Sequence, residues 1–278
     1  MRLRSLLFVP GDRPDRMEKA LGFGADALIL DLEDSVATTR KIEARAAVVA
    51  FLAREQRPTP LLVRINPVGG PYASDDLAAL REAKPDGLVL PKAEGAASIH
   101  ALSSWTGAPI LPIATETPSA LFELGSYREV GDRLLGLTWG AEDLPAAIGA
   151  TAAREPDGRY TAPIETVRSL ALFAAHAAGV RAIETVYPNF RDVEGLAAYA
   201  ARGARDGFTG MMAIHPDQVA VINRAFTPSE AEIAAARAIV DAFAAKPQAG
   251  VLAVDGRMVD APHLAHAHRL LERAGEAA

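Results

Sequence analysis

The sequence predicts a (β/α)8 TIM barrel, an α/β fold in which eight parallel strands alternate with helices. The chain has 278 residues and is half apolar, which suits one substantial core. Eight short apolar runs alternate with longer amphipathic segments, and no Pro-, Gly- or Ser-rich run separates them into two domains. An open, doubly wound sheet is the alternative that this pattern also allows.

The expected strands are mostly continuous apolar runs, as is typical of parallel strands buried on both faces. In chain order they are Leu6–Val9, Ala27–Leu30, Leu61–Ile65, Gly87–Leu90, Ile110–Ala114, Leu134–Trp139, Ala182–Val186 and Gly210–Ile214.

The segments between these strands carry apolar residues at spacings of three and four, which indicates amphipathic helices. The clearest are Lys41–Arg54, Asp75–Ala83, Ala96–Trp105, Pro163–Ala178 and Val193–Arg205. Pro14 and Pro118 suit the first turn of a helix, and Asp192 and Ser74 suit N-caps.

The last part of the chain is surplus to the barrel, which we expect to occupy residues 1–226. Residues 227–278 contain an expected helix at Ser229–Lys246, a hairpin-like segment GVLAVDGRMVD and a final helix near His263–Arg273. We interpret them as a C-terminal extension of the same domain that packs on a neighbouring subunit.

Composition excludes several classes of protein. The chain has no cysteine, so it forms no disulfide and uses no thiolate. A net charge of −6 argues against a general nucleic-acid partner. No apolar stretch approaches a membrane span, and the short apolar run before Pro10 does not resemble a secretion signal. We therefore expect a cytoplasmic protein with no membrane partner.

Ionisable side chains follow six of the eight expected strands. They converge on one mouth if the fold is a barrel, because the chemistry of such barrels lies at the carboxyl ends of the strands. The residues are Asp31, Glu33, Asp34, Arg64, Lys92, Glu116, Glu142, Asp143 and His215.

Each of these residues also has a purely structural interpretation. Glu116 suits a solvated loop, and Asp143 suits a helix cap. Arg64 lies in an apolar strand and needs an anionic partner, which is either a protein carboxylate or a substrate carboxylate. Lys92 suits an ion pair with a neighbouring Glu, and His215 suits closure of the barrel through its backbone.

Taken together, the set indicates a site for a hard cation. Carboxylates without cysteine, and with a single histidine at a strand end, favour Mg²⁺ over Zn²⁺, while Mn²⁺ shares the same oxygen ligands. A 2-oxo or 2-hydroxy acid chelates such a metal, and a nearby arginine can hold its carboxylate.

Eight segments of the sequence together resemble the citrate lyase β-subunit-like family, which includes malyl-CoA and citramalyl-CoA lyases. They are RSLLFVPGDRPDRMEKA, ALILDLEDSVATTRKIEAR, VRIN, LVLPK, ATETP, WGAEDL, GFTGMMAIHPDQ and DGRMVDAP, between residues 4 and 262. One departure is visible, because many relatives have a lysine where this chain has Met211–Met212.

The resemblance implies a homotrimer of (β/α)8 barrels with one divalent metal in each subunit. By motif position, Glu116 and Asp143 would bind the metal, and Glu116 would also face the substrate. Arg64 would hold the carboxylate of a 2-oxo acid and take part in catalysis.

The resemblance also implies residues for a thioester carrier and for proton transfer. Arg13 and Lys19 would contact the phosphates of a CoA-type carrier, and Phe8 would line that side. Asp260 would reach a neighbouring subunit's active site as the catalytic acid or base.

The implied reaction is Mg²⁺-dependent cleavage of a 3-hydroxy-acyl thioester to an acetyl thioester and a 2-oxo acid. The substrate would be a citryl, citramalyl or malyl thioester, and the oxo acid oxaloacetate, pyruvate or glyoxylate. The alternatives are a citrate lyase subunit that acts only on an acyl-carrier protein, a malyl-CoA thioesterase, and a class II aldolase that uses free 2-oxo acids.

Overall fold

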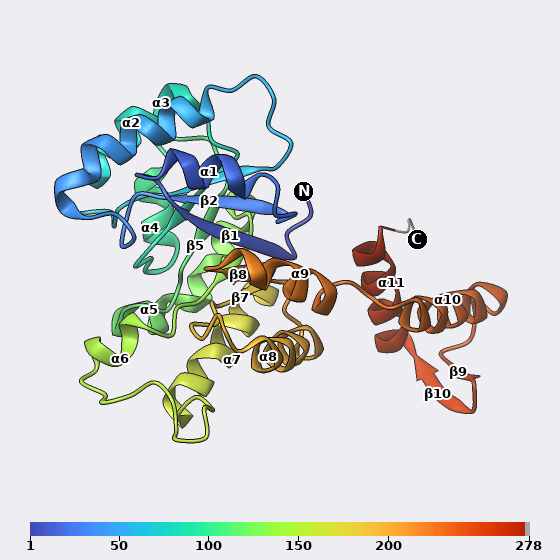
Figure 1. Cartoon of the computed structure of the whole chain (residues 1–278). Coiled ribbons are helices and arrows are strands. Elements are labelled where there is room, and N and C mark those ends of the chain that lie inside the picture. The colour runs from blue at the N-terminus through green and yellow to red at the C-terminus, as the bar shows by residue number, and fades with distance from the viewer. Residues whose placement is uncertain (276–278) are drawn as a thin grey trace. The chain divides into compact units, whose positions relative to one another are not determined.

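A computed structural model describes residues 1–275 of the chain (Figure 1). The chain forms two compact units, Met1–Asn223 and Arg224–Ala278. In the described part, no helix has both the length and the apolar character needed to cross a membrane.

The first unit is an eight-stranded parallel barrel, so the predicted fold class is confirmed. The strands run in the order β5-β4-β3-β2-β1-β8-β7-β6. Parallel bridges Ile110↔Leu134 and Ile113↔Thr138 join the two ends of this order, so the sheet closes on itself and the open-sheet alternative is wrong. The strands are β1 (Ser5–Pro10), β2 (Ala27–Asp31), β3 (Leu61–Arg64), β4 (Gly87–Leu90), β5 (Ile110–Pro112), β6 (Leu137–Thr138), β7 (Ala182–Glu184) and β8 (Gly210–Ala213).

Helices follow the strands and surround the barrel (Figure 1). Pro14 and Pro118 lie in the first turns of their helices, and the Asp192 side chain accepts a hydrogen bond from Gly195 N at the start of the eighth helix. The N-cap prediction for Ser74 is wrong, because that helix already begins at Ala73. The helices are α1 (Pro14–Ala20), α2 (Lys41–Leu52), α3 (Ala73–Ala83), α4 (Gly95–Leu102), α5 (Pro118–Glu123), α6 (Asp143–Ala147), α7 (Ala162–Ala177), α8 (Val193–Asp206) and α9 (Pro216–Ala225), with short 3-10 helices at Thr38–Arg40, Leu124–Glu129 and Gly131–Arg133.

One cluster of apolar side chains draws on seven of the eight strands and their immediate flanks. Leu6, Ile29, Leu62 and Val89 belong to it and are all fully buried or nearly so. Because side chains fill the interior of such a barrel, ligands reach only its ends. The polar residues that follow the strands are therefore the ones available for chemistry.

The second unit is a helix pair with a β-hairpin. Helix α10 (Glu230–Ala245) begins with a capping box formed by Ser229 and Glu232. Strands β9 (Val251–Val254) and β10 (Arg257–Asp260) pair antiparallel, and helix α11 (Ala261–Ala274) follows directly. Asp255 and Gly256 both have positive φ, as a two-residue hairpin turn requires. A small core of Ala236, Ala267, Leu270 and Leu271 lies between the two helices.

Candidate active site

Arg64 ends β3 and lies beside Asp31, which ends β2. The two residues are register partners in the sheet. The guanidinium donates two hydrogen bonds to the carboxylate, Nε to Oδ1 and Nη2 to Oδ2, both at 2.6 Å. Burial raises the pKa of Asp31, but the hydrogen bonds and charge of Arg64 outweigh it, so the net pKa lies below the usual value. Of the two partners that the sequence left open for Arg64, the structure contains the protein carboxylate.

The third nitrogen of Arg64 faces the barrel mouth with a different set of contacts. Its Nη1 lies 2.9 Å from Glu33 Oε2 and 3.6 Å from Asp34 Oδ2. The Glu33 contact is an ion pair without hydrogen-bond geometry, which leaves this buried carboxylate oxygen without a hydrogen-bond partner. The guanidinium also lies over the ring of Phe8, 4.8 Å from its centroid. Arg64 is thus oriented by Asp31 while Nη1 is held by looser contacts.

Lys41, a residue that the sequence did not single out, holds the loop after β2. Its Nζ donates to the carbonyl oxygens of Leu32 and Glu33, both at 2.7 Å, and to Asn66 Oδ1 at 2.9 Å. Burial lowers the pKa of Lys41. These three bonds tie the loop that carries Glu33 to the end of β3.

Lys92 contacts carboxylates from three other segments, and the expected pairing with a glutamate is confirmed. Its Nζ donates to Glu33 Oε1 at 3.0 Å and lies 3.6 Å from Asp143 Oδ1. Its backbone N–H donates to Glu116 Oε2 at 2.6 Å. The φ of Lys92 is 51°, in the left-handed region that side chains rarely adopt. Backbone strain of this kind is characteristic of functional sites.

Glu116 is buried rather than solvated, and it occupies space that a glycine leaves free. Only 5% of the residue is exposed. A Cβ at Gly140 would lie 2.9 Å from Glu116 Cγ and 3.3 Å from its Oε1, so only glycine fits there. Burial, with the negative charges of Asp143 and Glu33, raises the pKa of Glu116 to about 8. A bound cation would offset these charges and favour the ionised carboxylate.

This arrangement fits a hard divalent cation. Glu116 and Asp143 supply carboxylate oxygens, and Mg²⁺ is commonly held by one or two protein carboxylates, with substrate and water at its other positions. Among residues 1–275 no group of three or more Asp, Glu, His or Cys side chains forms a complete metal cage. A site completed by substrate and water is the kind that a catalytic Mg²⁺ uses.

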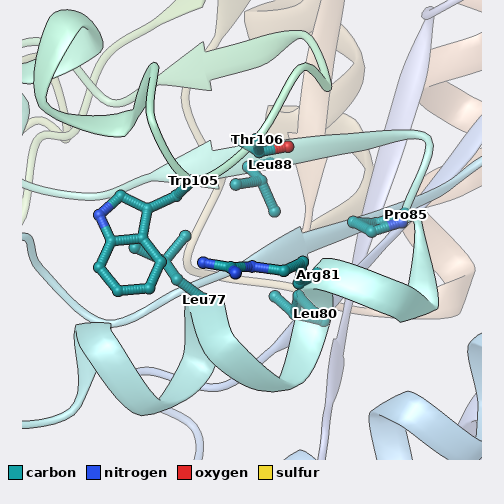
Figure 2. Close-up of a pocket in the computed structure, with 7 residues that line it drawn as sticks. All are labelled: Leu77, Leu80, Arg81, Pro85, Leu88, Trp105 and Thr106. Atoms are coloured by element: carbon teal, nitrogen blue, oxygen red, sulfur yellow. The ribbon is translucent and has the colours of Figure 1, made fainter.

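A depression of about 550 Å³ opens beside these residues. Its lining includes Glu33, Asp34, Lys41 and Lys92 together with residues of the segment from Asn66 to Tyr72. A second, much smaller pocket lies at the amino end of β4 between Trp105 and Leu77 (Figure 2). Its volume of about 10 Å³ suits one water at most, so we assign it no function.

Three further residues predicted for the site belong to other segments of the chain. Arg13 and Lys19 are on the loop after β1 and on α1, where Arg13 pairs with Asp15 at 3.1 Å and Lys19 is exposed. Asp260 belongs to the second unit, at the junction of β10 and α11. There its Oδ1 lies 2.5 Å from His263 Nδ1, and this contact lowers the pKa of Asp260.

His215 serves the end of the barrel through its backbone. Its N–H donates to Gln218 Oε1 at 3.2 Å, and the imidazole stacks on Phe190 with centroids 4.8 Å apart. The structural interpretation of His215 therefore agrees with the structure.

Sequence reasoning overlooked Glu184, which ends β7 and is fully buried. Its Oε1 accepts hydrogen bonds from Trp139 Nε1 at 2.6 Å, Tyr199 Oη at 2.9 Å and Thr185 N at 3.0 Å. Its Oε2 accepts from Arg168 Nε at 2.8 Å. The signal was present, because a glutamate within the apolar run AIETV requires buried donors just as Arg64 requires an anion.

Fold and site together define a (β/α)8 enzyme. At one end of its barrel, carboxylate oxygens that suit a hard cation lie near an arginine that is held by carboxylates. The chain belongs to the HpcH/HpaI aldolase/citrate lyase family, whose model matches residues 4–216. The predicted family and enzyme class, a metal-dependent oxo-acid lyase, are thereby confirmed.

Three relatives match nearly the whole chain. A citrate lyase subunit beta-like protein of Mycobacterium tuberculosis is 40% identical over 98% of this chain and 95% of its own length. A (3S)-malyl-CoA thioesterase of Cereibacter sphaeroides is 35% identical over 98% and 94%. The human mitochondrial citramalyl-CoA lyase is 34% identical over 95% and 83%.

A solved structure extends this similarity to the fold. Protein CitE of Mycobacterium tuberculosis, in complex with magnesium, acetoacetate and coenzyme A, superposes with a TM-score of 0.86 at 37% identity. The match covers 99% of each chain. The magnesium in that protein agrees with the cofactor expected from the carboxylates of this chain.

Proposed function

We propose that this protein is a Mg²⁺-dependent lyase that cleaves a 3-hydroxy-acyl-CoA thioester into acetyl-CoA and a 2-oxo acid. The observation that carries the proposal is the arrangement around Lys92, which brings Glu116, Asp143 and Glu33 together beside Arg64. Relatives named for citrate lyase, malyl-CoA and citramalyl-CoA activities support the thioester substrate.

Arg64 would hold the carboxylate of the 2-oxo acid. The carboxylate of Asp31 already fixes the plane of the guanidinium, so little ordering is needed when a substrate arrives. Nη1 would exchange its contact with Glu33 for the substrate carboxylate, and Glu33 keeps its bond to Lys92. After substrate binding, Arg64 would still be paired with Asp31 and Glu33 would still be paired with Lys92.

Glu116 and Asp143 would hold Mg²⁺, and Mn²⁺ would suit the same oxygens. The bound cation would lower the pKa of the substrate hydroxyl and offset the charge that develops as the carbon–carbon bond breaks. Lys92 N–H fixes the orientation of Glu116 through Oε2, and Gly140 leaves room for its Oε1. Glu116 and Asp143 would thus offer carboxylate oxygens to a cation that also binds the substrate hydroxyl.

In the cleavage itself, the hydroxyl proton would pass to solvent while the bond between the carbinol carbon and the α-carbon of the thioester breaks. The carbinol carbon becomes the carbonyl of the 2-oxo acid, and the α-carbon takes up a proton to give acetyl-CoA. We propose Asp260 as the acid that supplies this proton. In a homotrimer of the kind that the family resemblance implies, Asp260 would serve a neighbouring subunit.

The CoA carrier would lie along the first helix. Arg13 and Lys19 would contact its phosphates, and Phe8 would line the same side beneath Arg64. An acyl-carrier protein could present the same phosphopantetheine arm. A cytoplasmic location stays a prediction.

A coupled assay tests this function. Purified protein is given malyl-CoA, citramalyl-CoA and citryl-CoA with Mg²⁺, and then with EDTA. We expect EDTA-sensitive release of acetyl-CoA together with glyoxylate, pyruvate or oxaloacetate. If no CoA ester is cleaved but the corresponding acyl-carrier thioester is, the protein acts as a citrate lyase subunit. Turnover of free 2-oxo acids with aldehydes alone would instead indicate a class II aldolase.

A thioesterase is the second candidate, because a relative named (3S)-malyl-CoA thioesterase is 35% identical over 98% of this chain. In that reaction water adds to the thioester carbonyl and CoA leaves as its thiol, while the carbon–carbon bond stays intact. The products separate the two activities. Free thiol and malate from malyl-CoA indicate the thioesterase, whereas acetyl-CoA and glyoxylate indicate the lyase.

A further inference from the structure

The buried cluster around Glu184 adjoins the segment that carries one of the candidate metal ligands. Trp139 follows β6 directly, is fully buried, and donates its indole N–H to Glu184 Oε1 at 2.6 Å. Asp143 lies four residues further along the chain, in the first turn of α6. The indole of Trp139 therefore anchors the start of the segment that leads to Asp143.

A second tether holds the same segment from the other side. Gly140 N donates to Thr115 Oγ1 at 3.0 Å, and the hydroxyl donates in return to Gly140 O at 3.1 Å. Thr115 immediately precedes Glu116, whose side chain packs against Gly140. Trp139 and Gly140 thus link the Glu184 cluster to both candidate metal ligands.

The cluster itself is rigid for a physical reason. Three hydrogen bonds reach Glu184 Oε1 and one reaches Oε2, which also lies 2.7 Å from Arg168 Nη2 in an ion pair. Arg168, with only 3% of its side chain exposed, also bonds to Asp206 Oδ2 at 2.7 Å. The carboxylate therefore cannot turn without losing buried hydrogen bonds. The indole of Trp139, which donates one of those bonds, cannot turn either.

We infer that Glu184 is a positioning residue for the metal site and acts through the indole of Trp139. The Glu184 carboxylate fixes the indole of Trp139, and Trp139 fixes the backbone of the next residue, Gly140. Gly140 leaves the space that the Glu116 side chain occupies, and the segment that leads to Asp143 begins there. The inference rests on the proposed function insofar as Glu116 and Asp143 bind the metal. Residues that orient metal ligands from behind typically affect metal affinity by about 10–100-fold.

Two substitutions test this inference. Each removes one of the hydrogen bonds that Glu184 Oε1 accepts. Trp139→Phe removes the indole N–H, and Tyr199→Phe removes the phenol O–H, which donates to Glu184 from α8 rather than from the segment that leads to Asp143. Mn²⁺ affinity is measured without substrate by electron paramagnetic resonance, and thermal unfolding is measured in parallel. We expect Trp139→Phe to raise the Kd for Mn²⁺ about 10-fold or more, while Tyr199→Phe leaves it within about 2-fold.

A third variant keeps the test decisive if Trp139→Phe does not fold. Thr115→Val removes the opposite tether of Gly140 with little change in volume, and we expect the same rise in Kd. Equal Kd values for the natural protein and both tether variants would overturn the positioning role. Absence of Mn²⁺ binding by the natural protein would instead refute the proposed metal site, so the two failures are distinguishable.

Discussion

The Arg64–Asp31 and Arg168–Glu184 pairs both place a carboxylate at the carboxyl end of a strand, and they differ in how accessible their other atoms are. At β2 and β3, Arg64 pairs with Asp31, and its side chain is 11% exposed. At β7, Arg168 pairs with Glu184, and its side chain is 3% exposed. Both pairs place a guanidinium beside a carboxylate that is almost fully enclosed.

The difference lies in the neighbouring atoms. Glu184 accepts four hydrogen bonds and is fully buried, so no ligand can reach it. Arg64 instead keeps one nitrogen in ion pairs with Glu33 and Asp34, near the depression that Glu33 lines. An enclosed pair supports structure, whereas a pair with an ion-paired nitrogen beside an open depression can exchange its partner for a substrate. Four variants test this contrast.

The largest effect is expected at the enclosed pair. Arg168→Met leaves Glu184 without its cation, and the free energy of unfolding should fall by about 3–5 kcal/mol because an unpaired buried charge remains. Guanidinium denaturation measures this loss. Arg202→Met is the matched control, because it breaks a half-exposed pair with Glu165 and should cost less than about 1 kcal/mol. Equal losses would show that burial of the pair does not determine its contribution.

At the open pair we expect a change in catalysis rather than in folding. Arg64→Lys keeps the charge beside Asp31 but removes the planar fork, so kcat/KM should fall by about 10–100-fold with a smaller loss of stability. Steady-state kinetics in the direction of condensation, with the 2-oxo acid varied, measures it. Unchanged kcat/KM with reduced stability would mean that Arg64 has only its structural partner.

The pH dependence of stability sharpens the same contrast. The lowered pKa of Asp31 contributes stability that is present at neutral pH and lost as the pH falls through that pKa. In Arg64→Met the guanidinium no longer opposes burial, and only the hydrogen bonds from Ser35 and Glu33 still lower the pKa of Asp31. The pKa of Asp31 should therefore rise, and its ionised form should contribute less stability at neutral pH. The deficit of the variant should therefore be largest near pH 7 and shrink toward about pH 4, by about 1.4 kcal/mol for each unit of pKa difference.

The unfolding free energies of the natural protein and of Arg64→Met, measured from pH 4 to 8, test this change. The lower limit of this range is the usual carboxylate pKa, near 4. A deficit that does not vary with pH would mean that Asp31 stays ionised without Arg64. Solvent entering the site of the missing side chain would then be screening the carboxylate.

The smallest effect is expected at the exposed residues of α1. Lys19→Ala should raise KM for the CoA thioester by about 2–5-fold, with unchanged thermal stability, because an exposed charge contributes little and is screened by salt. Repeating the assay at high salt should reduce the difference. Arg205→Ala on α8 removes an equally exposed charge and serves as the control. An equal rise in KM for both variants would argue against a phosphate contact at Lys19.

Much of the fold could be predicted because its signals are local. Apolar runs located all eight strands, and Pro14, Pro118 and Asp192 marked the starts of their helices. The carboxyl ends of the strands pointed to Glu116, Asp143, Arg64 and Lys92. Ser74 shows the limit of this reasoning, because one helix began just before the residue expected to cap it.

By itself, the sequence determined the order of strands and helices, the family, and the requirement that Arg64 meet an anion. Tertiary structure alone decided that this anion is Asp31, 33 residues earlier in the chain, because the register of β2 and β3 places the two side by side. It also decided that Lys92 turns its N–H toward Glu116 and that Glu184 accepts from Trp139, Tyr199 and Arg168. Periodicity reports which face of an element is apolar, whereas these contacts depend on the pairing and register of neighbouring strands, which bring distant segments of the chain together.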